Sequence, residues 1–120
     1  MHTPGHTEGC KSLFFDVTDG KNTYTVAMFG GAGMNSIRKK FLDAYGLPHS
    51  LRQDLVDSLE RVRGEKVDIL IGNHPGDAGT KQKYERILAG EENPFLDPTA
   101  WHRRLDYIKG QYDTMIAEGK

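Results

Sequence analysis

Two strand-like segments joined by a short turn constrain the fold of this chain more than any other feature. Residues 11–17 (KSLFFDV) and 23–29 (TYTVAMF) are rich in β-branched and aromatic side chains, which favour extended backbone. Asp19, Gly20 and Asn22 lie between them and are typical turn residues. The pattern predicts a β-hairpin, so the fold has to be built around a sheet.

Helical spacing of apolar residues predicts four helices after the hairpin. They cover residues 37–45, 50–63 and 81–89, and a long segment that starts at Asp97-Pro98. The long helix carries one apolar stripe, formed by Trp101, Leu105, Ile108, Tyr112 and Met115. In the third helix we expect the inward-facing residues to be Tyr84, Ile87 and Leu88.

The predicted helices also carry recognisable capping residues at their starts. Asn35 or Ser36 is the expected N-cap of the first helix. Ser50, with Gln53 three residues later, has the pattern of a capping box before the second helix. Asp97 is the expected N-cap of the last helix.

An apolar run from Val67 to Ile71, interrupted only by Asp68, predicts a buried strand between the second and third helices. A hairpin, one further strand and several amphipathic helices together indicate an α/β (α+β) architecture, a small sheet with helices packed on it. The 120 residues suit one domain or part of one.

Composition excludes several classes of partner. The formal net charge is -1 and the basic residues form no long block, which argues against a nucleic-acid partner. A membrane span needs about 20 consecutive apolar residues, and the sequence has no such run. Cys10 is the only cysteine, which excludes an internal disulfide and fits a reducing cytoplasm. A secretion signal on an upstream segment would not be visible in this sequence.

Two of the five histidines, His6 and His74, share a setting that suits metal binding. Each lies in a loop framed by glycine and proline, beside a predicted strand. Neutral imidazole is the commonest metal ligand in proteins, and strand ends in α/β layers are where sites are built. Their separation along the sequence is no local metal signature, however. The residues alone therefore leave a second interpretation open, in which both are ordinary exposed loop histidines.

Several motifs resemble the metallo-β-lactamase superfamily. Residues 3–9 (TPGHTEG) are similar to its TPGHTxG loop, whose histidine binds the first zinc ion and which precedes a hairpin, as residues 12–29 do here. Residues 72–76 (GNHPG) resemble the segment whose late histidine binds the second zinc ion. Residues 93–95 (NPF) and 97–98 (DP) resemble the tail of the subclass whose ligands are mostly histidines. The resemblance runs along essentially the whole chain.

The resemblance implies the C-terminal part of an αββα sandwich with zinc as its cofactor, two ions in the complete domain. It implies that His6 and His74 are metal ligands, and that the Thr7 hydroxyl orients His6. The other residues expected to border the site are Gly30, Gly31 and Asn73. For the glycine pair, a plain tight turn is the alternative.

Two departures from the family pattern matter. The HxHxDH motif, which supplies most of the family's metal ligands, is absent, because no two histidines have that spacing. Residues 27–31 (AMFGG) also contain neither the Asp nor the Cys that many members place at the end of the second hairpin strand. This fits the lactamase subclass without a protein ligand there, and argues against phosphodiesterase or glyoxalase-like members.

The resemblance implies that the complete protein, of which this chain would be a part, carries out metal-assisted hydrolysis. In that reaction a zinc-held hydroxide attacks a small-molecule amide or ester such as a β-lactam. A catalytic zinc needs about three protein ligands, whereas this chain offers one histidine for each ion. We therefore expect residues 1–120 to be a partial domain whose N-terminal part is missing, and to be inactive alone. Two alternatives stay open: a non-catalytic binding or structural module, and one chain of a split hydrolase whose partner supplies HxHxDH.

Two geometric expectations follow from this interpretation. The side chains of His6 and His74 should converge on the same face of the molecule, at one edge of the sheet, and lie within several ångströms of each other. Half a sandwich should also leave one face of the hairpin bare. We expect that face to draw on the apolar residues of the two strands, which are Phe14, Phe15, Tyr24, Val26 and Met28.

Overall fold

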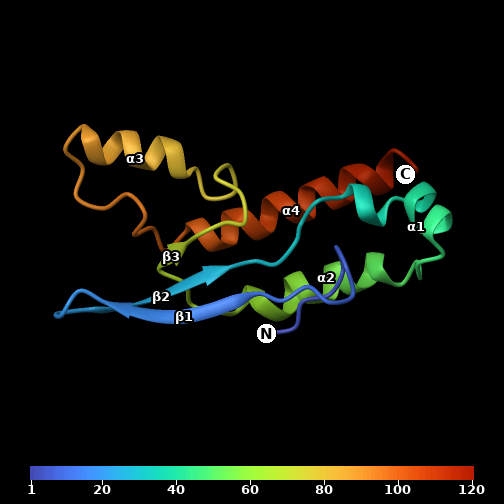
Figure 1. Ribbon diagram of the computed structural model, residues 1–120, viewed down its shortest axis with the longest axis horizontal. Helices are drawn as coiled ribbons and strands as arrows, with labels where there is room; N and C mark the ends of the chain where they lie inside the picture. Colours follow the sequence, from blue (N-terminus) through green and yellow to red (C-terminus); the bar gives the residue numbers. More distant parts are fainter.

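The computed structural model describes residues 1–120 as a three-stranded sheet with helices packed along it (Figure 1). In chain order the elements are β1 (Leu13–Thr18), β2 (Thr23–Met28), the 3-10 helix η1 (Asn35–Ile37), α1 (Lys39–Tyr45), α2 (Leu51–Arg63), β3 (Ile69–Leu70), α3 (Thr80–Leu88) and α4 (Ala100–Ala117). The strand order in the sheet is β1-β2-β3. The expected α+β class is therefore confirmed. No helix is both long and apolar enough to cross a membrane.

The predicted hairpin is present with a regular register. Strands β1 and β2 are antiparallel, with pairs running from Leu13 opposite Met28 to Thr18 opposite Thr23. The turn is held by the Asp19 carboxylate, whose Oδ1 accepts hydrogen bonds of 2.8 Å from two successive backbone N–H groups. These bonds favour the ionised carboxylate and lower the pKa of Asp19.

The predicted third strand lies beside β2 in parallel, but only its central residues, Ile69 and Leu70, have regular strand geometry. Asp68 explains the irregular start. Its backbone N–H donates to the carbonyl of Thr25 at 2.9 Å, and its carboxylate accepts from the Thr25 N–H at 2.9 Å. A side chain thus takes the place of a main-chain acceptor at this point of the sheet.

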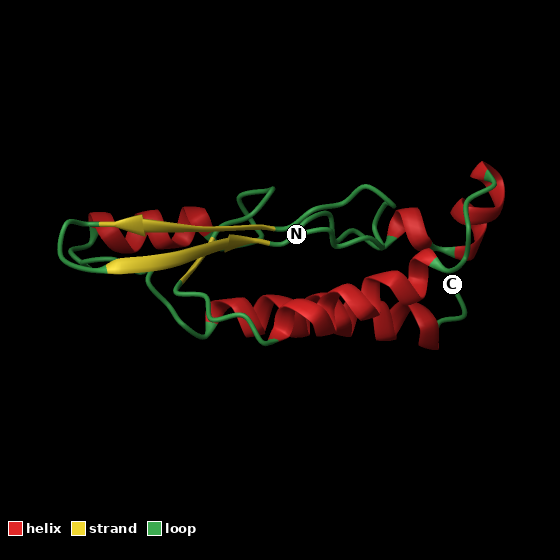
Figure 2. Ribbon diagram, turned by 90° about the horizontal axis from the view of Figure 1, so that it is seen from below, coloured by secondary structure: helices red, strands yellow, loops and turns green.

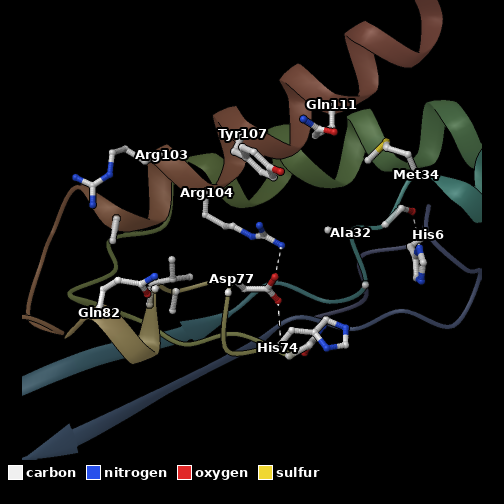
Figure 3. Close-up of a pocket in the computed structure, with 18 of the residues that line it drawn as sticks. His6, Ala32, Met34, His74, Asp77, Gln82, Arg103, Arg104, Tyr107 and Gln111 are labelled. Carbon is white, nitrogen blue, oxygen red and sulfur yellow. Dashed lines mark hydrogen bonds and ion pairs between the residues drawn. The ribbon is translucent and has the colours of Figure 1, made fainter. Parts of the chain in front are cut away.

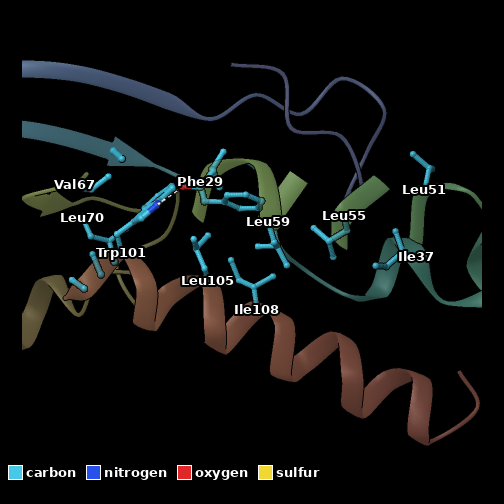
Figure 4. Close-up of a cluster of buried hydrophobic side chains, with 14 of the residues drawn as sticks. Phe29, Ile37, Leu51, Leu55, Leu59, Val67, Leu70, Trp101, Leu105 and Ile108 are labelled. Atoms are coloured by element: carbon cyan, nitrogen blue, oxygen red, sulfur yellow. Dashed lines mark hydrogen bonds between the residues drawn. The ribbon is translucent and has the colours of Figure 1, made fainter. Parts of the chain in front are cut away.

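Helices α2 and α4 form a layer against one face of the sheet (Figure 2). A core of sixteen buried apolar residues runs from the sheet along α2 and α4 to the η1 and α1 end of the molecule (Figure 4). Trp101, Leu105, Leu55 and Leu59 are almost completely buried in it. Trp101 meets Phe14 edge-on with ring centroids 5.4 Å apart, and its indole N–H donates to the Val62 carbonyl at 3.0 Å. The predicted stripe of α4 is therefore the stripe that faces the core.

Several expected helix starts differ from the structure. The segment predicted as one helix over 37–45 is split, because Arg38 is extended (φ -67°, ψ 143°) between η1 and α1. Ser50 has helical backbone angles and makes no capping hydrogen bond, while Gln53 bonds Asp57 instead. Since Ser50 already has helical geometry, its side chain cannot reach forward as a cap does.

The start of α4 also lies later than predicted. Asp97 does not cap the helix, which begins at Ala100. Its carboxylate instead accepts hydrogen bonds from the hydroxyl and backbone N–H of Thr99 and pairs with Arg103 at 2.7 Å. These contacts, the Thr99 hydroxyl first, lower the pKa of Asp97 to about 2. The residue therefore stabilises the turn before the helix.

The predicted inward face of α3 is wrong. Tyr84 and Leu88 are 58% and 70% exposed, and Ile87 is 38% exposed. The buried residue of this helix is Lys83, at 8%. Helical spacing identifies an apolar stripe, but it does not say whether another element covers that stripe, and here none does.

One face of the hairpin is bare along β1 but covered along β2, so the expectation holds only in part: Phe15 is exposed, whereas Val26, which lies opposite it, is 4% exposed. Leu13, Phe15 and Val17 alternate along β1 and are 48%, 45% and 38% exposed, whereas Phe14 points the other way, onto Trp101. The radius of gyration is 16.0 Å, compared with about 13.6 Å for a compact domain of this length. The exposed area is 7230 Å², compared with about 6,500 Å² for a compact monomer of this mass.

Replacing Trp101 should destabilise the whole chain. We expect Trp101→Ala to lower the free energy of unfolding by about 3–5 kcal/mol, because it opens a cavity between the hairpin, α2 and α4 and removes the bond to Val62. Tyr107→Ala, on the same helix but 59% exposed, should cost less than about 1 kcal/mol. Urea denaturation followed by circular dichroism measures both. Equal midpoints for the two variants would contradict the central role of the indole.

The bare hairpin face should make the isolated chain self-associate. We expect a sedimentation coefficient that rises with concentration in the micromolar range, because the exposed apolar residues lie beside the free edge of β1. Phe15→Lys should shift the chain towards monomer, since a charge on this face opposes pairing. Tyr45→Lys adds the same charge on α1, at a side chain that is 69% exposed, and should leave association unchanged. A wild-type chain that stays monomeric at all concentrations would refute the expectation.

Candidate metal-ligand groove

The loop that carries His6 is fixed on helix α2. Gly5 has φ of 144°, and a Cβ at this position would lie 2.5 Å from the Cα of Leu55, so only glycine allows this approach. The hydroxyl of Ser58 donates to the carbonyl of Pro4 at 2.7 Å. On the other side, the buried hydroxyl of Thr3 lies 2.8 Å from that of Ser12. The loop is therefore held from both the helix and the hairpin.

The imidazole of His6 is oriented by two partners on the segment after β2. Its Nδ1 lies 2.7 Å from the Gly33 carbonyl and 3.0 Å from the Ser36 hydroxyl, which itself donates to the His6 carbonyl at 2.7 Å. A carbonyl can only accept, so Nδ1 must carry the proton. In the neutral imidazole, Nε2 then has a free lone pair, which is the form that binds a metal.

Gly31 is in contact with the ring of His6. A Cβ at this position would lie 2.2 Å from Cδ2 and 2.8 Å from Cγ of the imidazole, so any side chain here would displace the ring. Gly30 has a different role. It packs on the backbone of Lys11, and its N–H donates to the Ser12 hydroxyl at 3.0 Å. Of the two glycines expected to border the site, Gly31 alone touches a candidate ligand.

The expected contact from Thr7 to His6 is not made. The Thr7 hydroxyl is exposed and lies 3.1 Å from the Cys10 sulfur. Instead, the His6 ring donates to the Gly33 carbonyl, and the Ser36 hydroxyl donates to the His6 carbonyl. Both partners lie about thirty residues further along the chain. Thr7 therefore braces the loop, and the segment after the hairpin orients the imidazole.

His74 lies in a tight loop between β3 and α3, and Asp77 organises this loop. The Asp77 carboxylate accepts from the His74 N–H at 3.2 Å and pairs with Arg104 of α4 at 3.0 Å. Both partners of this ion pair are mostly buried, with side chains 19% and 16% exposed. Asn73 donates from its side chain to the Phe29 carbonyl at 3.4 Å, which ties the loop to the end of β2.

Both histidines line one groove, of about 1090 Å³, between the loop after β2, the His74 loop, α3 and α4 (Figure 3). The two imidazoles thus share a face of the molecule, as expected. His74 is exposed and its ring makes no hydrogen bond, so both of its nitrogens are open to a ligand. No three His, Cys, Asp or Glu side chains are grouped to hold a metal ion. The chain offers two separate candidate ligands and no complete site.

The other three histidines are engaged outside the groove. His2 bonds the Glu8 carbonyl at 2.6 Å, His49 pairs with Asp43 at 2.7 Å, and His102 bonds the Arg63 carbonyl at 2.9 Å. Sequence reasoning missed Asp77 and Lys83, which line the groove, and Ser36, which bonds His6. Only Asp77 had a usable signal, since an Asp three residues after His74 in a Gly/Pro loop is a common turn-forming arrangement.

Filling the space beside His6 should disturb its ring. We expect Gly31→Ala to lower the free energy of unfolding by about 1–3 kcal/mol and to displace the imidazole, because the added methyl group occupies the position of the ring. Gly76→Ala, also in the groove but with no neighbour within 4 Å, should change stability by about 0.5 kcal/mol or less. Nitrogen-15 NMR of the imidazole measures the effect. A protonated Nδ1 signal unchanged in Gly31→Ala would contradict the close contact.

Comparison with known proteins gives a consistent result for the fold. No protein-family model and no curated protein matches the chain. Among solved structures, a subclass B3 metallo-β-lactamase of Bradyrhizobium japonicum is 27% identical, with a TM-score of 0.82 over 98% of this chain and 43% of that one. The metallo-β-lactamase of Legionella gormanii is 26% identical, with a TM-score of 0.82 over 98% of this chain and 44% of that one.

A more distant structure, a metallo-β-lactamase of Cronobacter sakazakii, is 24% identical with a TM-score of 0.77 and supports the fold alone. It is covered over 41% of its length, and this chain over 99%. The chain thus spans less than half the length of the enzymes it matches, while almost all of its own residues superpose on them. The chain is a C-terminal portion of the metallo-β-lactamase fold.

Proposed function

We propose that the chain is the C-terminal part of a zinc-dependent hydrolase that acts on an amide or ester, such as a β-lactam. The observation that carries this proposal is the state of His6. Its Nδ1 is bound to a backbone carbonyl, and its Nε2 is free on the wall of a groove that it shares with His74. A histidine that serves only to stabilise a loop has no need of this arrangement.

The donor set fits a zinc site in kind but not in number. Neutral imidazole nitrogens are preferred zinc ligands, and a ligating histidine usually donates its other N–H to a carbonyl or carboxylate. His6 meets both conditions through Gly33. The His74 ring makes no hydrogen bond, while its backbone N–H is held by the Asp77 carboxylate. A catalytic site needs about three protein ligands for each ion, so the remaining ligands have to come from residues outside this chain.

When bound, zinc would supply Lewis acidity and lower the pKa of a coordinated water towards neutrality. The residues of this chain do the positioning. Gly33 and Ser36 hold the plane of the His6 ring, and Asp77 with Arg104 holds the loop of His74. The bare hairpin face is where the remainder of the sandwich would pack, because Leu13, Phe15 and Val17 have no cover in this chain.

The chain alone should bind zinc weakly and hydrolyse no β-lactam, because one histidine for each ion leaves both ions under-coordinated. Joining it to an N-terminal segment that carries HxHxDH, covalently or as a second chain, should give tight binding of two zinc ions and a hydrolytic activity. His6→Ala should abolish the activity and His74→Ala should sharply reduce it. Zinc affinity should fall by more than the roughly 10–100-fold that loss of an outer partner costs.

His49→Ala is the matched control, since this histidine pairs with Asp43 outside the groove and its loss should leave zinc binding and hydrolysis unchanged. Zinc content by mass spectrometry and hydrolysis by absorbance give the two readouts. A joined protein that binds two zinc ions equally well without His6 and His74 would overturn their assignment. Tight zinc binding without any hydrolysis would favour a non-catalytic module.

A further inference from the structure

Residues 72–95, which we call the flap, leave the sheet after β3 and return beside it. At the base of the flap, Ile69 of β3 forms an antiparallel bridge with Leu96, so its two ends are held side by side by residues outside it. Between these ends the flap carries the His74 loop and α3. Helix α3 lies outside the layer that α2 and α4 form (Figure 2).

Helix α3 has almost no apolar anchor on the rest of the chain. Eight of its nine residues are exposed, and the exception is Lys83. Within the flap, Ala78 is the one member of the buried apolar core, and its side chain is a single methyl group. Burial of apolar area, which stabilises α2 and α4, therefore contributes little to holding α3 in place.

Helix α3 is also weak in itself. It has nine residues, whereas isolated helices shorter than about 12–15 residues are marginal in water. Its N-cap is Gly79, which has no side chain to bond the first N–H groups. The first turn contains Lys81 and no acidic residue, so its charge opposes the helix dipole. The helix therefore depends on the contacts that hold the flap as a whole.

Two polar side-chain contacts join the flap to the rest of the chain, and they differ in strength. Asp77 pairs with Arg104 of α4 at 3.0 Å, and both side chains are mostly buried. The second contact runs from the Asn73 side chain to the Phe29 carbonyl and is 3.4 Å long, near the limit for a hydrogen bond. The Arg104–Asp77 pair, which we call the latch, is therefore the main attachment.

The latch also fixes His74. One oxygen of the Asp77 carboxylate accepts from Arg104, and the other accepts from the His74 N–H at 3.2 Å (Figure 3). Helix α3 forms one wall of the groove, through Gln82 and Arg86. Loss of the latch would therefore release the His74 backbone and this wall together.

We propose that the flap opens and closes as one unit, and that the Arg104–Asp77 pair controls its opening. Opening widens the groove and moves His74 relative to His6. Segments with few buried apolar contacts open at a lower free energy than the whole chain. As a statement about motion, the inference stands on the contacts of this chain alone. Its consequence for a metal site rests on the proposed function, because only there is His74 a ligand.

Hydrogen exchange of the whole 120-residue chain, followed by mass spectrometry in rising sub-denaturing urea, tests the motion. We expect the amides of α3 and of the His74 loop to exchange at least about a hundredfold faster than those at the centre of α4. Exchange of α3 that matches α4 at every urea concentration would refute the proposal. It would mean that α3 opens only when the whole chain unfolds.

Arg104→Gln is the decisive variant, because it removes the charge of the latch and keeps a polar side chain on α4. It should speed exchange roughly tenfold, equally in the His74 loop and in α3, and leave α2 unchanged, since a mostly buried ion pair is broken. Arg63→Gln is the matched control, because Arg63 pairs with Asp106 at 2.8 Å, between α2 and α4. It should change flap exchange by less than about twofold.

The pattern of the increase decides between the alternatives. Faster exchange confined to α3 would mean that the helix frays independently of His74, and the flap would not be one unit. An equal increase in α2, α4 and the flap would reduce the latch to a general stability contact and overturn the proposal. If Arg104→Gln does not fold, Asp77→Asn replaces it with the same expected increase. The asparagine keeps an oxygen for the His74 N–H and loses the charge.

The joined, zinc-binding protein separates the motion from the proposed function. There the flap should exchange at least about tenfold more slowly with zinc than with a chelator, because a ligand bound to the closed form opposes opening. Flap exchange that zinc does not slow, in a chain that otherwise behaves as expected, would remove His74 as a ligand and keep the flap. Zinc-dependent hydrolysis with flap exchange unchanged by Arg104→Gln would remove the latch and keep the hydrolase.

Discussion

The side chain of Trp101 joins the three parts of the chain on which everything else is built. It comes from the first turn of α4, meets Phe14 of the hairpin edge-on at 5.4 Å and donates its N–H to the last turn of α2. The indole is completely buried. Large aromatic side chains contribute more burial than any other residue, and the polar N–H fixes their orientation when it finds a partner. Sheet and helix layer are thus held at one relative position.

The position of His6 depends on this arrangement in two steps. Trp101 fixes α2 against the sheet, and α2 in turn carries the His6 loop through the close approach of Gly5 to Leu55. The hairpin meets the same loop from the other side through Ser12, whose hydroxyl bonds both Thr3 and the Gly30 N–H. Because the loop is held by both layers, a shift between them would move the imidazole away from Gly33.

The sequence allowed the fold to be predicted where spacing and burial agree. The hairpin and the stripe of α4 were predictable because Phe14, Trp101 and Leu105 follow the strand and helix periods and are also covered. The stripe of α3 has the same period, but Leu88 is 70% exposed, because covering a stripe needs a neighbour that periodicity does not describe.

The candidate ligands could be found from loop motifs, but the residues that orient them could not. Ser36 reads as a helix cap in the sequence, and it reaches His6 only because the loop after β2 folds back over the TPGHT loop. Arg104 likewise reads as an ordinary surface position on α4, and its role appears only when the His74 loop brings Asp77 to it. Contacts between segments far apart in the sequence cannot be predicted from the local sequence of either segment.

For the zinc site proposed above, the chain would supply geometry without affinity. His6 is held in its ligand tautomer by a backbone carbonyl, and the backbone of His74 by a largely buried ion pair, so both are ordered by contacts within these 120 residues. Ordering of this kind lowers the entropy cost of binding an ion. It does not replace the missing ligands, because the free energy of zinc binding comes chiefly from the number of donors.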